Sequence, residues 1–328
     1  MLHILNGDEA AQIFKETTIE GDTAIWRETL MEGPVTPAHN LMDFFEMREK
    51  YIGDTYGGSP ADYRQKILSE WKKIEDSENE DIVLWFEFDF FCQVNLFFLL
   101  HFLSQRKTNG KVFLICPGQF PGIFDFKGLG QLNPRQLEDL YPERREFNRN
   151  DLAEGALIWK AFSSDTPGQI LEILNKDFPA FPYLKTAFVC HLRRFPSTLN
   201  GLDYVEHKLL SLIREGYNQI QFLYQRIWIE DKDFGLGDLQ ILNYLLGLQN
   251  SPTPLITVSD LGSIERPNLA NLSLWRFNLT DTGEDVLTGK TDWVRLNGID
   301  RWLGGIHLKG KTIPWRYSQT QQTLVPTA

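Results

Sequence analysis

The chain has 328 residues, of which 42% are hydrophobic and 13% aromatic, and its formal net charge is −11. This length suggests two domains, and the composition is typical of a globular protein rather than a disordered one. An acidic chain disfavours sequence-independent binding to nucleic acid, which depends on basic patches that contact phosphates.

The negative charge is concentrated in residues 1–130, which carry 12 Lys and Arg against 21 Asp and Glu. Such a segment suits a bound cation or a basic partner, although a solvated surface is the more common explanation. The three cysteines, Cys92, Cys116 and Cys190, lack close spacing and indicate reduced, buried thiols rather than a disulfide framework. Because the N-terminus also lacks the pattern of a signal peptide, we expect a cytoplasmic protein.

Four apolar runs separated by helical patterns predict the first domain, over residues 1–130. The runs are Leu2–Leu5, Thr23–Arg27, Ile82–Phe86 and Lys111–Cys116. Their alternation with helices indicates an α/β domain with a mostly parallel sheet and Rossmann- or flavodoxin-like layers. The stretch from 81 to 106 is apolar enough to suggest a membrane span, but two carboxylates inside it would each cost about 2.5–3.5 kcal/mol in a bilayer. We therefore expect a core strand and helix, and no membrane contact.

The remainder of the chain is mainly helical by pattern. Residues 131–196 show helical spacing between prolines and predict a helical bridge. Residues 197–317 predict three helices and then two strands, which is the order of a winged helix-turn-helix. The expected elements are Gly201–Glu215, Asn218–Trp228, Gly237–Leu248, Pro254–Val258 and Leu274–Leu279. Residues 318–328 predict a flexible tail.

Several separate segments resemble a bacterial protein family known as domain of unknown function 1835, in its long form. They are LNGDEAA, GDTAIWRETLMEGPV, IVLWFEFDFFCQVNLFFLLHFL, GLGQLNPRQLEDLY, WKAFSSDTP, LRRFPSTLNGLDYVEHKLL, LGDLQILNYL and DRWLGGIHLKGKTIPWRY. The resemblance covers most of the chain. It implies an N-terminal α/β module and a C-terminal winged-helix-like region, and it implies no activity.

Polar side chains follow three of the predicted strands, where a parallel sheet places its ligands. These candidate ligand-binding residues are Asn6, Asp8, Arg27, Glu28, Glu32, Glu87, Asp89 and Gln93. Grouped carboxylates suit Mg²⁺, which would in turn hold a phosphate. The alternative is structural: Asp8 and Asp89 as helix N-caps, Glu28 and Glu32 as solvated loop charges, and Arg27 as an ion-pair partner.

A second cluster near the C-terminus combines unusual residues with a Gly-Gly pair. Its members are Arg301, Trp302, His307, Trp315 and Arg316. One interpretation is a lip in which Arg301, His307 and Arg316 face a ligand. The favoured one is a structural hairpin that turns at Gly304-Gly305, with Trp302 and Trp315 packed on each other.

Common catalytic motifs are missing from the sequence, which contains no GxGxxG, GxxxxGK[ST], HExxH or GxSxG. The segment Gly237–Leu248, which would enter a DNA groove, has no Lys or Arg, although Arg266, Arg276, Lys290 and Arg295 could gather on one face.

Three hypotheses follow from the sequence, in this order. The first is a ligand-sensing or protein-interaction protein whose site lies at the C-terminal edge of the sheet. The second is an Mg²⁺-dependent enzyme that acts on a phosphorylated substrate, and the third is a winged-helix DNA-binding regulator. The sequence leaves open whether the protein forms a homodimer. Binding to nucleic acid is disfavoured but not excluded.

Overall fold

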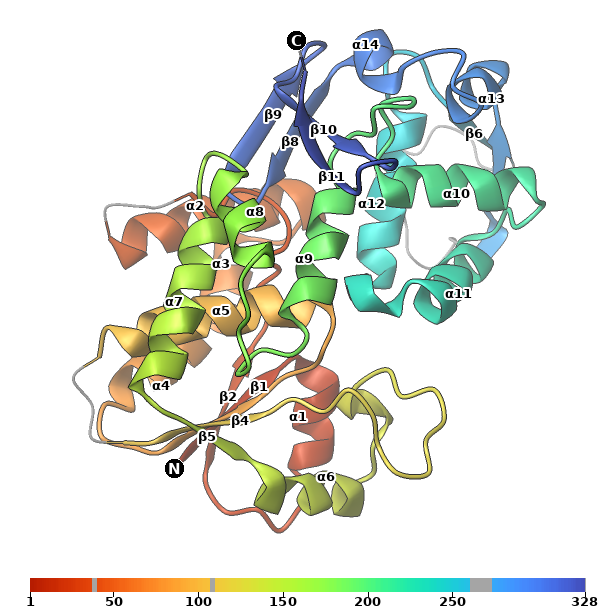
Figure 1. Cartoon of the computed structure of the whole chain (residues 1–328). Coiled ribbons are helices and arrows are strands. Elements are labelled where there is room, and N and C mark those ends of the chain that lie inside the picture. The colour runs from red at the N-terminus through yellow and green to blue at the C-terminus, as the bar shows by residue number, and fades with distance from the viewer. Residues whose placement is uncertain (37–39, 107–109, 260–272, 328) are drawn as a thin grey trace. The chain divides into compact units, whose positions relative to one another are not determined.

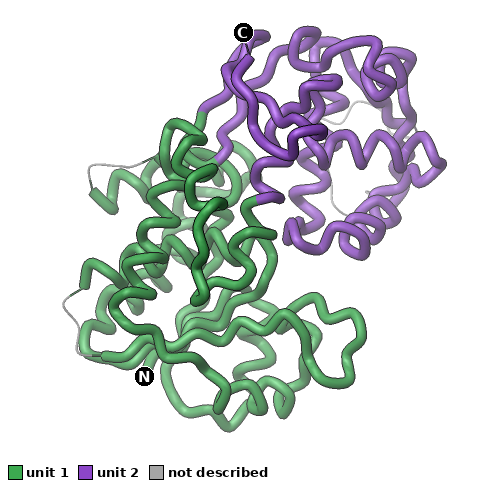
Figure 2. Tube along the Cα trace, in the orientation of Figure 1, with its two compact units in different colours: residues 1–188, 304–306 green, residues 189–303, 307–328 purple. Residues whose placement is uncertain are grey.

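A computed structural model describes residues 1–36, 40–106, 110–259 and 273–327. The chain forms two compact units, which are coloured separately in Figure 2. Unit 1 contains residues 1–188 and 304–306, and unit 2 contains residues 189–303 and 307–328. The boundary expected at residue 130 is therefore not a boundary between the units, because residues 131–188 pack with the first domain.

Unit 1 is an α/β unit with a five-stranded sheet in the order β2-β1-β3-β4-β5 (Figure 1). The first four strands are parallel, and β5 runs antiparallel to β4. Its elements are β1 (Leu2–Asn6), α1 (Asp8–Phe14), β2 (Asp22–Trp26), α2 (Leu41–Tyr56), α3 (Pro60–Tyr63), the π-helical η1 (Arg64–Leu68), α4 (Ser69–Asp76), β3 (Ile82–Trp85), α5 (Phe90–Ser104), β4 (Val112–Ile115), η2 (Leu129–Gln131), α6 (Pro134–Leu140), η3 (Tyr141–Glu143), β5 (Arg145–Phe147), α7 (Arg149–Phe162), α8 (Gly168–Leu174) and the first half of α9 (Leu184–Arg193). The predicted α/β class with a mostly parallel sheet is confirmed.

Strand β5 lies inside the segment expected to be a helical bridge. It is three residues long and only Phe147 is buried. A strand this short offers no alternation of apolar and polar residues, which is the signal that identifies strands in a sequence. The bridge is therefore partly wrong: its first part completes the sheet, and its helices α7 and α8 follow.

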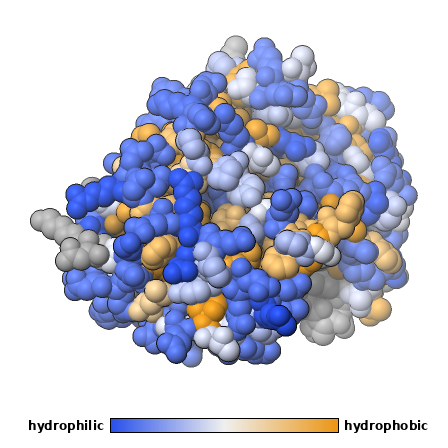
Figure 3. All heavy atoms as spheres, turned by 60° about the horizontal axis from the view of Figure 1, so that its bottom comes forward, coloured by the Kyte–Doolittle hydropathy of each residue, from blue (hydrophilic) through white to orange (hydrophobic). Residues whose placement is uncertain are grey.

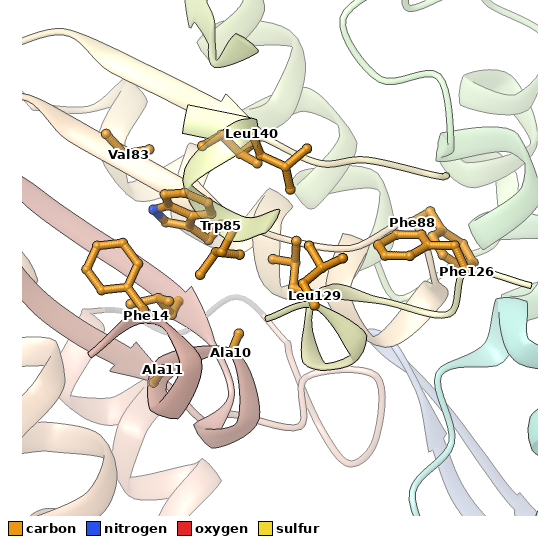
Figure 4. Close-up of a cluster of buried hydrophobic side chains, with 13 residues drawn as sticks. Ala10, Ala11, Phe14, Val83, Trp85, Phe88, Phe126, Leu129 and Leu140 are labelled. Carbon is orange, nitrogen blue, oxygen red and sulfur yellow. The ribbon is translucent and has the colours of Figure 1, made fainter. Parts of the chain in front are cut away.

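Helices cover both faces of this sheet. On one face, α1 and α6 enclose a cluster in which Trp85 lies between Phe14 and Leu140, with Phe88 beside Phe126 (Figure 4). Alternate strand residues point into this cluster, as the period of two in a strand requires. On the other face, Trp26 of β2 stacks on Phe98 of α5 at 5.4 Å between ring centroids.

Helix α5 is the central helix of unit 1. It lies between the sheet and α7, and α7 approaches closely because a Cβ at Gly155 would lie 2.7 Å from the side chain of Leu100. The Phe98 and Trp159 rings meet edge to face at 5.1 Å. Within the described part of the chain, no helix has the length and apolarity that crossing a membrane requires. The prediction that Ile82–Leu103 is a core strand and helix is confirmed.

Unit 2 combines helices with three two-stranded sheets. Its elements are the end of α9, α10 (Tyr204–Arg214), α11 (Ile220–Glu230), η4 (Lys232–Phe234), α12 (Asp238–Gln249), β6 (Ile256–Ser259), β7 (Arg276–Leu279), α13 (Asp281–Leu287), α14 (Trp293–Asn297), β8 (Ile299–Leu303), β9 (Ile306–Gly310), β10 (Trp315–Ser318) and β11 (Thr323–Pro326). The sheets are β6-β7, β8-β9 and β10-β11. Arg266, one of the basic residues considered for DNA, lies outside the described residues.

The expected flexible tail is wrong for the described residues 318–327. Thr323–Pro326 pairs with Trp315–Ser318 in antiparallel register, and Leu324 is buried. The polar composition of this segment suggests disorder, yet an edge strand needs only backbone pairing and one or two buried side chains.

The surface is mainly polar where it is seen in Figure 3, with hydrophobic residues in small separate groups. Single exposed hydrophobic residues of this kind are normal for a globular protein. Most of the large aromatic side chains instead lie in the cores, among them Trp26, Trp85 and Phe97.

Candidate functional site

The order of the strands creates a switch point between β1 and β3. The chain leaves β1 through α1 on one face of the sheet, and it returns from β2 to β3 through α2, α3 and α4 on the other. Connections that diverge to opposite faces leave a crevice at the carboxyl ends of the two strands, which is where ligands bind in open α/β sheets. A ligand site is therefore expected among the residues that follow β1 and β3.

Three side chains cluster at this point: Glu87, Asp89 and Cys92. One carboxylate oxygen from each acid and the Cys92 sulfur all lie within 4.8 Å of one another. Asp89 is the N-cap of α5, as predicted, and its Oδ1 accepts the Cys92 N–H at 2.9 Å. The Cys92 thiol donates to Glu87 Oε2 at 3.5 Å, and the amide of Asn6 donates to the Cys92 sulfur at 2.9 Å. The sequence predicted the acidic members, but nothing in it indicated the thiol between them.

Glu87 is also held from the loop after β4. The Leu129 N–H donates to Glu87 Oε1. Gly128, at φ +150°, leaves room for this contact, since a Cβ there would lie 2.3 Å from the same oxygen. Leu129 itself packs into the cluster of Figure 4, so the hydrophobic core fixes the backbone that meets the carboxylate.

Burial changes the protonation of these groups. It raises the pKa of Glu87 to about 7, with a further contribution from the Asp89 charge, and it raises the pKa of Asp89 to about 6. Two carboxyl groups this close repel each other when both are ionised, so the pair retains a proton near neutral pH. Burial also raises the pKa of the Cys92 thiol well above its ordinary value, which makes it a poor nucleophile.

The donor set at this cluster does not match Mg²⁺ well. Mg²⁺ prefers six oxygen ligands, whereas the third ligand atom here is a sulfur, which suits zinc better. The oxygens also have partners already, because Glu87 accepts from Leu129 and Cys92. A cation at this position would have to displace those hydrogen bonds.

Asp8 and Arg27 lie at the neighbouring ends of α1 and β2 and form an ion pair with each other. The Arg27 Nη2 lies 2.7 Å from Asp8 Oδ1, and this pairing lowers the pKa of Asp8. Asp8 is not the N-cap that its position suggested, because Gly7 occupies the cap and Asp8 begins the helix. The alternative expectation for Arg27, as an ion-pair partner, fits the structure.

Glu28 and Glu32 are buried rather than solvated, which corrects one of the expectations above. Arg48 of α2, itself fully buried, lies 2.9 Å from Glu28 Oε2 and also donates to the carbonyl of Glu32. The hydroxyl of Tyr63 donates to the other Glu28 oxygen, and that of Tyr56 donates to Glu32. The loop after β2 therefore surrounds the Arg48 guanidinium, and the carboxylates of Glu28 and Glu32 stabilise the fold.

A pocket of about 240 Å³ opens at the carboxyl end of β4. It is lined by residues from α5, β4, the turn before β5, the start of β5 and the loop before α9. They are Gln93, Leu96, Leu114, Ile115, Cys116, Pro117, Leu140, Glu143, Arg145, Pro179, Ala180, Phe181, Pro182 and Tyr183. Of these, the sequence indicated Gln93 alone, because the others are far apart in the chain and belong to no motif.

Gln93 connects the pocket to the acidic cluster. Its Nε2 donates to the Glu87 carbonyl at 2.8 Å and lies 3.5 Å from the Cys116 sulfur. Asn95, two residues further along α5, donates to Asn6 and to the Glu28 carbonyl. Helix α5 thus ties together the ends of β1, β2, β3 and β4 at one edge of the sheet.

The C-terminal residues bind separate partners within unit 2. Arg301 pairs with Asp203 and Glu206, and Arg316 pairs with Asp292 and with the Ser197 carbonyl. These are structural contacts that hold strands to helices, so Arg301 and Arg316 do not face one ligand together.

The hairpin expected in the same segment is present. Strands β8 and β9 form a two-stranded sheet that turns at Gly304-Gly305. Trp302 stacks on His307 at 4.2 Å, and His307 lies 2.6 Å from Asp300. Trp302 therefore packs across its own hairpin rather than on Trp315, which lies in β10.

No protein-family model matches the chain, and a search of the curated proteins found no significant match. What the chain binds therefore has to be inferred from the chemistry of the sheet edge.

Proposed function

We propose that unit 1 is a ligand-sensing domain, and that the pocket at the carboxyl end of β4 holds a small molecule with an apolar body. The pocket carries this proposal. Its volume of about 240 Å³ is slightly below the range of about 300–1,000 Å³ that is usual for ligand sites. A predominantly apolar lining with a few polar atoms is the usual character of such sites.

The amide oxygen of Gln93 supports a ligand with a hydrogen-bond donor. Gln93 is only 1% exposed, and its oxygen accepts no hydrogen bond from the described residues. The oxygen nevertheless keeps some solvent-accessible surface, because it is not one of the fully buried atoms that lack a hydrogen-bond partner. Because Gln93 lines the pocket, we infer that this oxygen faces the pocket and can accept a hydrogen bond from a ligand.

Tyr183 supplies a second polar contact on the other side of the pocket. The backbone of Gly118 lies close to its hydroxyl oxygen, since a Cβ at Gly118 would lie 2.4 Å from that oxygen. Burial raises the pKa of Tyr183, so the hydroxyl keeps its proton and can donate to a ligand. Glu143 and Arg145 lie among the lining residues as well and provide charge near the opening.

A sensing role is supported by the link from Gln93 to Glu87. A ligand that bonds to Gln93 acts on the residue that holds the backbone of Glu87, whose pKa is raised by burial and by the Asp89 charge. Occupation of the pocket would thereby alter the start of α5. The alternative of an Mg²⁺-dependent enzyme rests on the same two carboxylates and has the weaker support of a mixed donor set.

We also infer that the chain is a long-form member of the family of domain of unknown function 1835, with a winged-helix-like unit 2. The order of α10, α11, α12, β6 and β7 supports this inference. Helix α12 begins with an acidic residue, Asp238, and contains no Lys or Arg. A packing role for this unit is therefore favoured over recognition of DNA.

The test is a calorimetric titration of the full chain with benzamide and with toluene, in the wild type and in Gln93→Met. Benzamide offers both a ring and an N–H donor, so we expect wild-type protein to bind it at least tenfold more tightly than it binds toluene. Gln93→Met should bring the two affinities together. Gln119→Met is the matched control, because Gln119 is exposed and lies outside the pocket. Equal affinities in the wild type, or no binding of either probe, would overturn the proposal.

A further inference from the structure

Unit 2 contains a pocket of its own, with a volume of about 400 Å³. It is formed by the end of α9, the turn that leads into α10, and the β10-β11 hairpin. The lining residues that matter here are Arg193, Phe195, Leu202, Tyr204, Tyr317 and Gln322. Because the C-terminal hairpin closes one side, this pocket depends on the very segment that the sequence suggested was a flexible tail.

Arg193 brings a guanidinium to this pocket. Its guanidinium carbon lies 3.4 Å from the centroid of the Tyr204 ring. Among the residues that the structure describes, Arg193 forms no ion pair with a carboxylate. The hydroxyl of Tyr204 donates to Asp231 at 2.5 Å, which fixes the ring beneath the guanidinium. A guanidinium stacked by one face on an aromatic ring keeps its edge N–H groups available for a planar anion.

Tyr317 places a hydroxyl on the same pocket. The residue is 9% exposed, and within the described chain its hydroxyl has no hydrogen-bond partner. The oxygen is not sealed in the protein either, so its remaining contact is with the pocket that the ring lines. Burial raises the pKa of Tyr317, and the phenol therefore stays protonated and able to donate at neutral pH.

The remaining walls suit a flat apolar group. Val189 is 42% exposed and contributes apolar surface, while Phe195 and Leu202 are fully buried behind the wall. Gln322, at the hairpin end of the pocket, has a left-handed backbone at φ 53°, which is uncommon for a residue other than glycine.

We propose that this pocket binds a small aromatic anion, whose charged oxygens accept from Arg193 and Tyr317 while its ring packs against the apolar wall that includes Val189. Two donors of this kind, one of them cationic, match the oxygens of a carboxylate or a phosphate monoester. The site is independent of the pocket proposed for unit 1, since the two share no residue.

Calorimetric titration of the full chain with four probes tests this inference: benzoate, phenyl phosphate, phenol and inorganic phosphate. We expect benzoate or phenyl phosphate to bind at least tenfold more tightly than phenol, which lacks the charge, and than inorganic phosphate, which lacks the ring. The preferred anion of the two identifies the headgroup. Its affinity should also fall as salt is added, because a partly exposed charge pair is screened.

Three variants identify the residues responsible. Arg193→Gln should weaken binding of the preferred anion at least tenfold, Arg193→Lys should weaken it less, and Tyr317→Phe should weaken it several-fold while keeping the ring. Arg295→Gln is the control, because Arg295 is an exposed arginine of unit 2 outside the pocket. Circular dichroism checks that each variant is folded. If Arg193→Gln does not fold, Tyr317→Phe tests the inference in its place.

The inference fails if phenol binds as tightly as the anions, or if no probe binds. It also fails if Arg295→Gln weakens binding as much as Arg193→Gln does. Loss of benzamide binding in Gln93→Met has no bearing on it, so the two pockets are tested separately.

Discussion

Two carboxylate sites lie at the carboxyl edge of the same sheet, and they are neutralised in different ways; Glu28 and Asp89 are buried and Glu87 is half-buried. After β2, Glu28 is paired with the buried guanidinium of Arg48. After β3, Glu87 and Asp89 have no cation in an ion pair among the described residues, and burial raises the pKa of both. One site is thus neutralised by a fixed counter-charge and the other by a proton. The second site can therefore change its charge near neutral pH.

This difference separates a structural site from a responsive one. The guanidinium of Arg48 donates to backbone carbonyls of the loop as well as to Glu28, so removing it affects the fold at every pH. Glu87, with its pKa raised to about 7, can gain or lose a proton near neutral pH, and Gln93 connects it to a pocket. Burial of a carboxylate does not by itself distinguish a structural site from a responsive one. The group that neutralises the carboxylate, a cation or a proton, does distinguish them.

The largest effect should come from removing the fixed counter-charge. Arg48→Met leaves Glu28 buried without a cation, and we expect a loss of about 3–5 kcal/mol in the free energy of unfolding. Urea denaturation followed by circular dichroism measures it. The matched control is Arg64→Met, because Arg64 is exposed and pairs with Glu49 at 3.3 Å. That change should cost less than about 1 kcal/mol, and similar losses in the two variants would contradict the assignment of Glu28–Arg48 as a structural pair.

The second prediction concerns the dependence of stability on pH. The pKa of Glu87 is about 7 in the folded chain against an ordinary value of 4.5, so the folded state retains a proton that the unfolded state releases. The contribution of Glu87 to the free energy of unfolding should therefore be fully present at pH values below its ordinary pKa of 4.5. It should be lost as the pH rises through its folded-state pKa of about 7. Glu87→Gln cannot ionise, and its stability relative to the wild type should rise by about 2–3 kcal/mol between about pH 5 and about pH 8.

Urea denaturation at a series of pH values measures this gap, and Glu46→Gln is the control because Glu46 is exposed on α2. The control should keep a constant difference from the wild type across the same range. A Glu87→Gln variant whose difference from the wild type does not change with pH would show that Glu87 is ionised throughout, and the contrast with Glu28 would disappear.

The sequence predicted the parts of unit 1 that depend on local pattern. The apolar run before Glu87 and the helix after Asp89 are continuous in the chain, so the strand, the helix and the N-cap could all be predicted. The partner of Glu28 could not, because Arg48 lies 20 residues away on a helix whose packing no local pattern specifies. Short-range signals describe elements, and long-range pairs depend on the topology.

The same reasoning explains why the pockets were missed. The unit 1 pocket joins Gln93, Cys116, Arg145 and Tyr183, which come from four different elements and have no fixed spacing. The unit 2 pocket depends on a hairpin whose residues are polar and have little strand pattern. Both sites arise where the fold brings unrelated segments together, and a sequence without aligned relatives carries no sign of them.

The smallest effect is expected from Mg²⁺. Each Glu87 oxygen already accepts a hydrogen bond, and the third ligand atom of the cluster is the Cys92 sulfur, which Mg²⁺ does not favour. Thermal unfolding should therefore give the same change in Tm on adding Mg²⁺ in the wild type and in Glu87→Gln, with Zn²⁺ as a comparison that tolerates sulfur. Should Mg²⁺ stabilise the wild type alone, by mass action on a folded-state site, the carboxylates after β3 would be metal ligands and the enzymatic hypothesis would gain the support that the geometry now denies it.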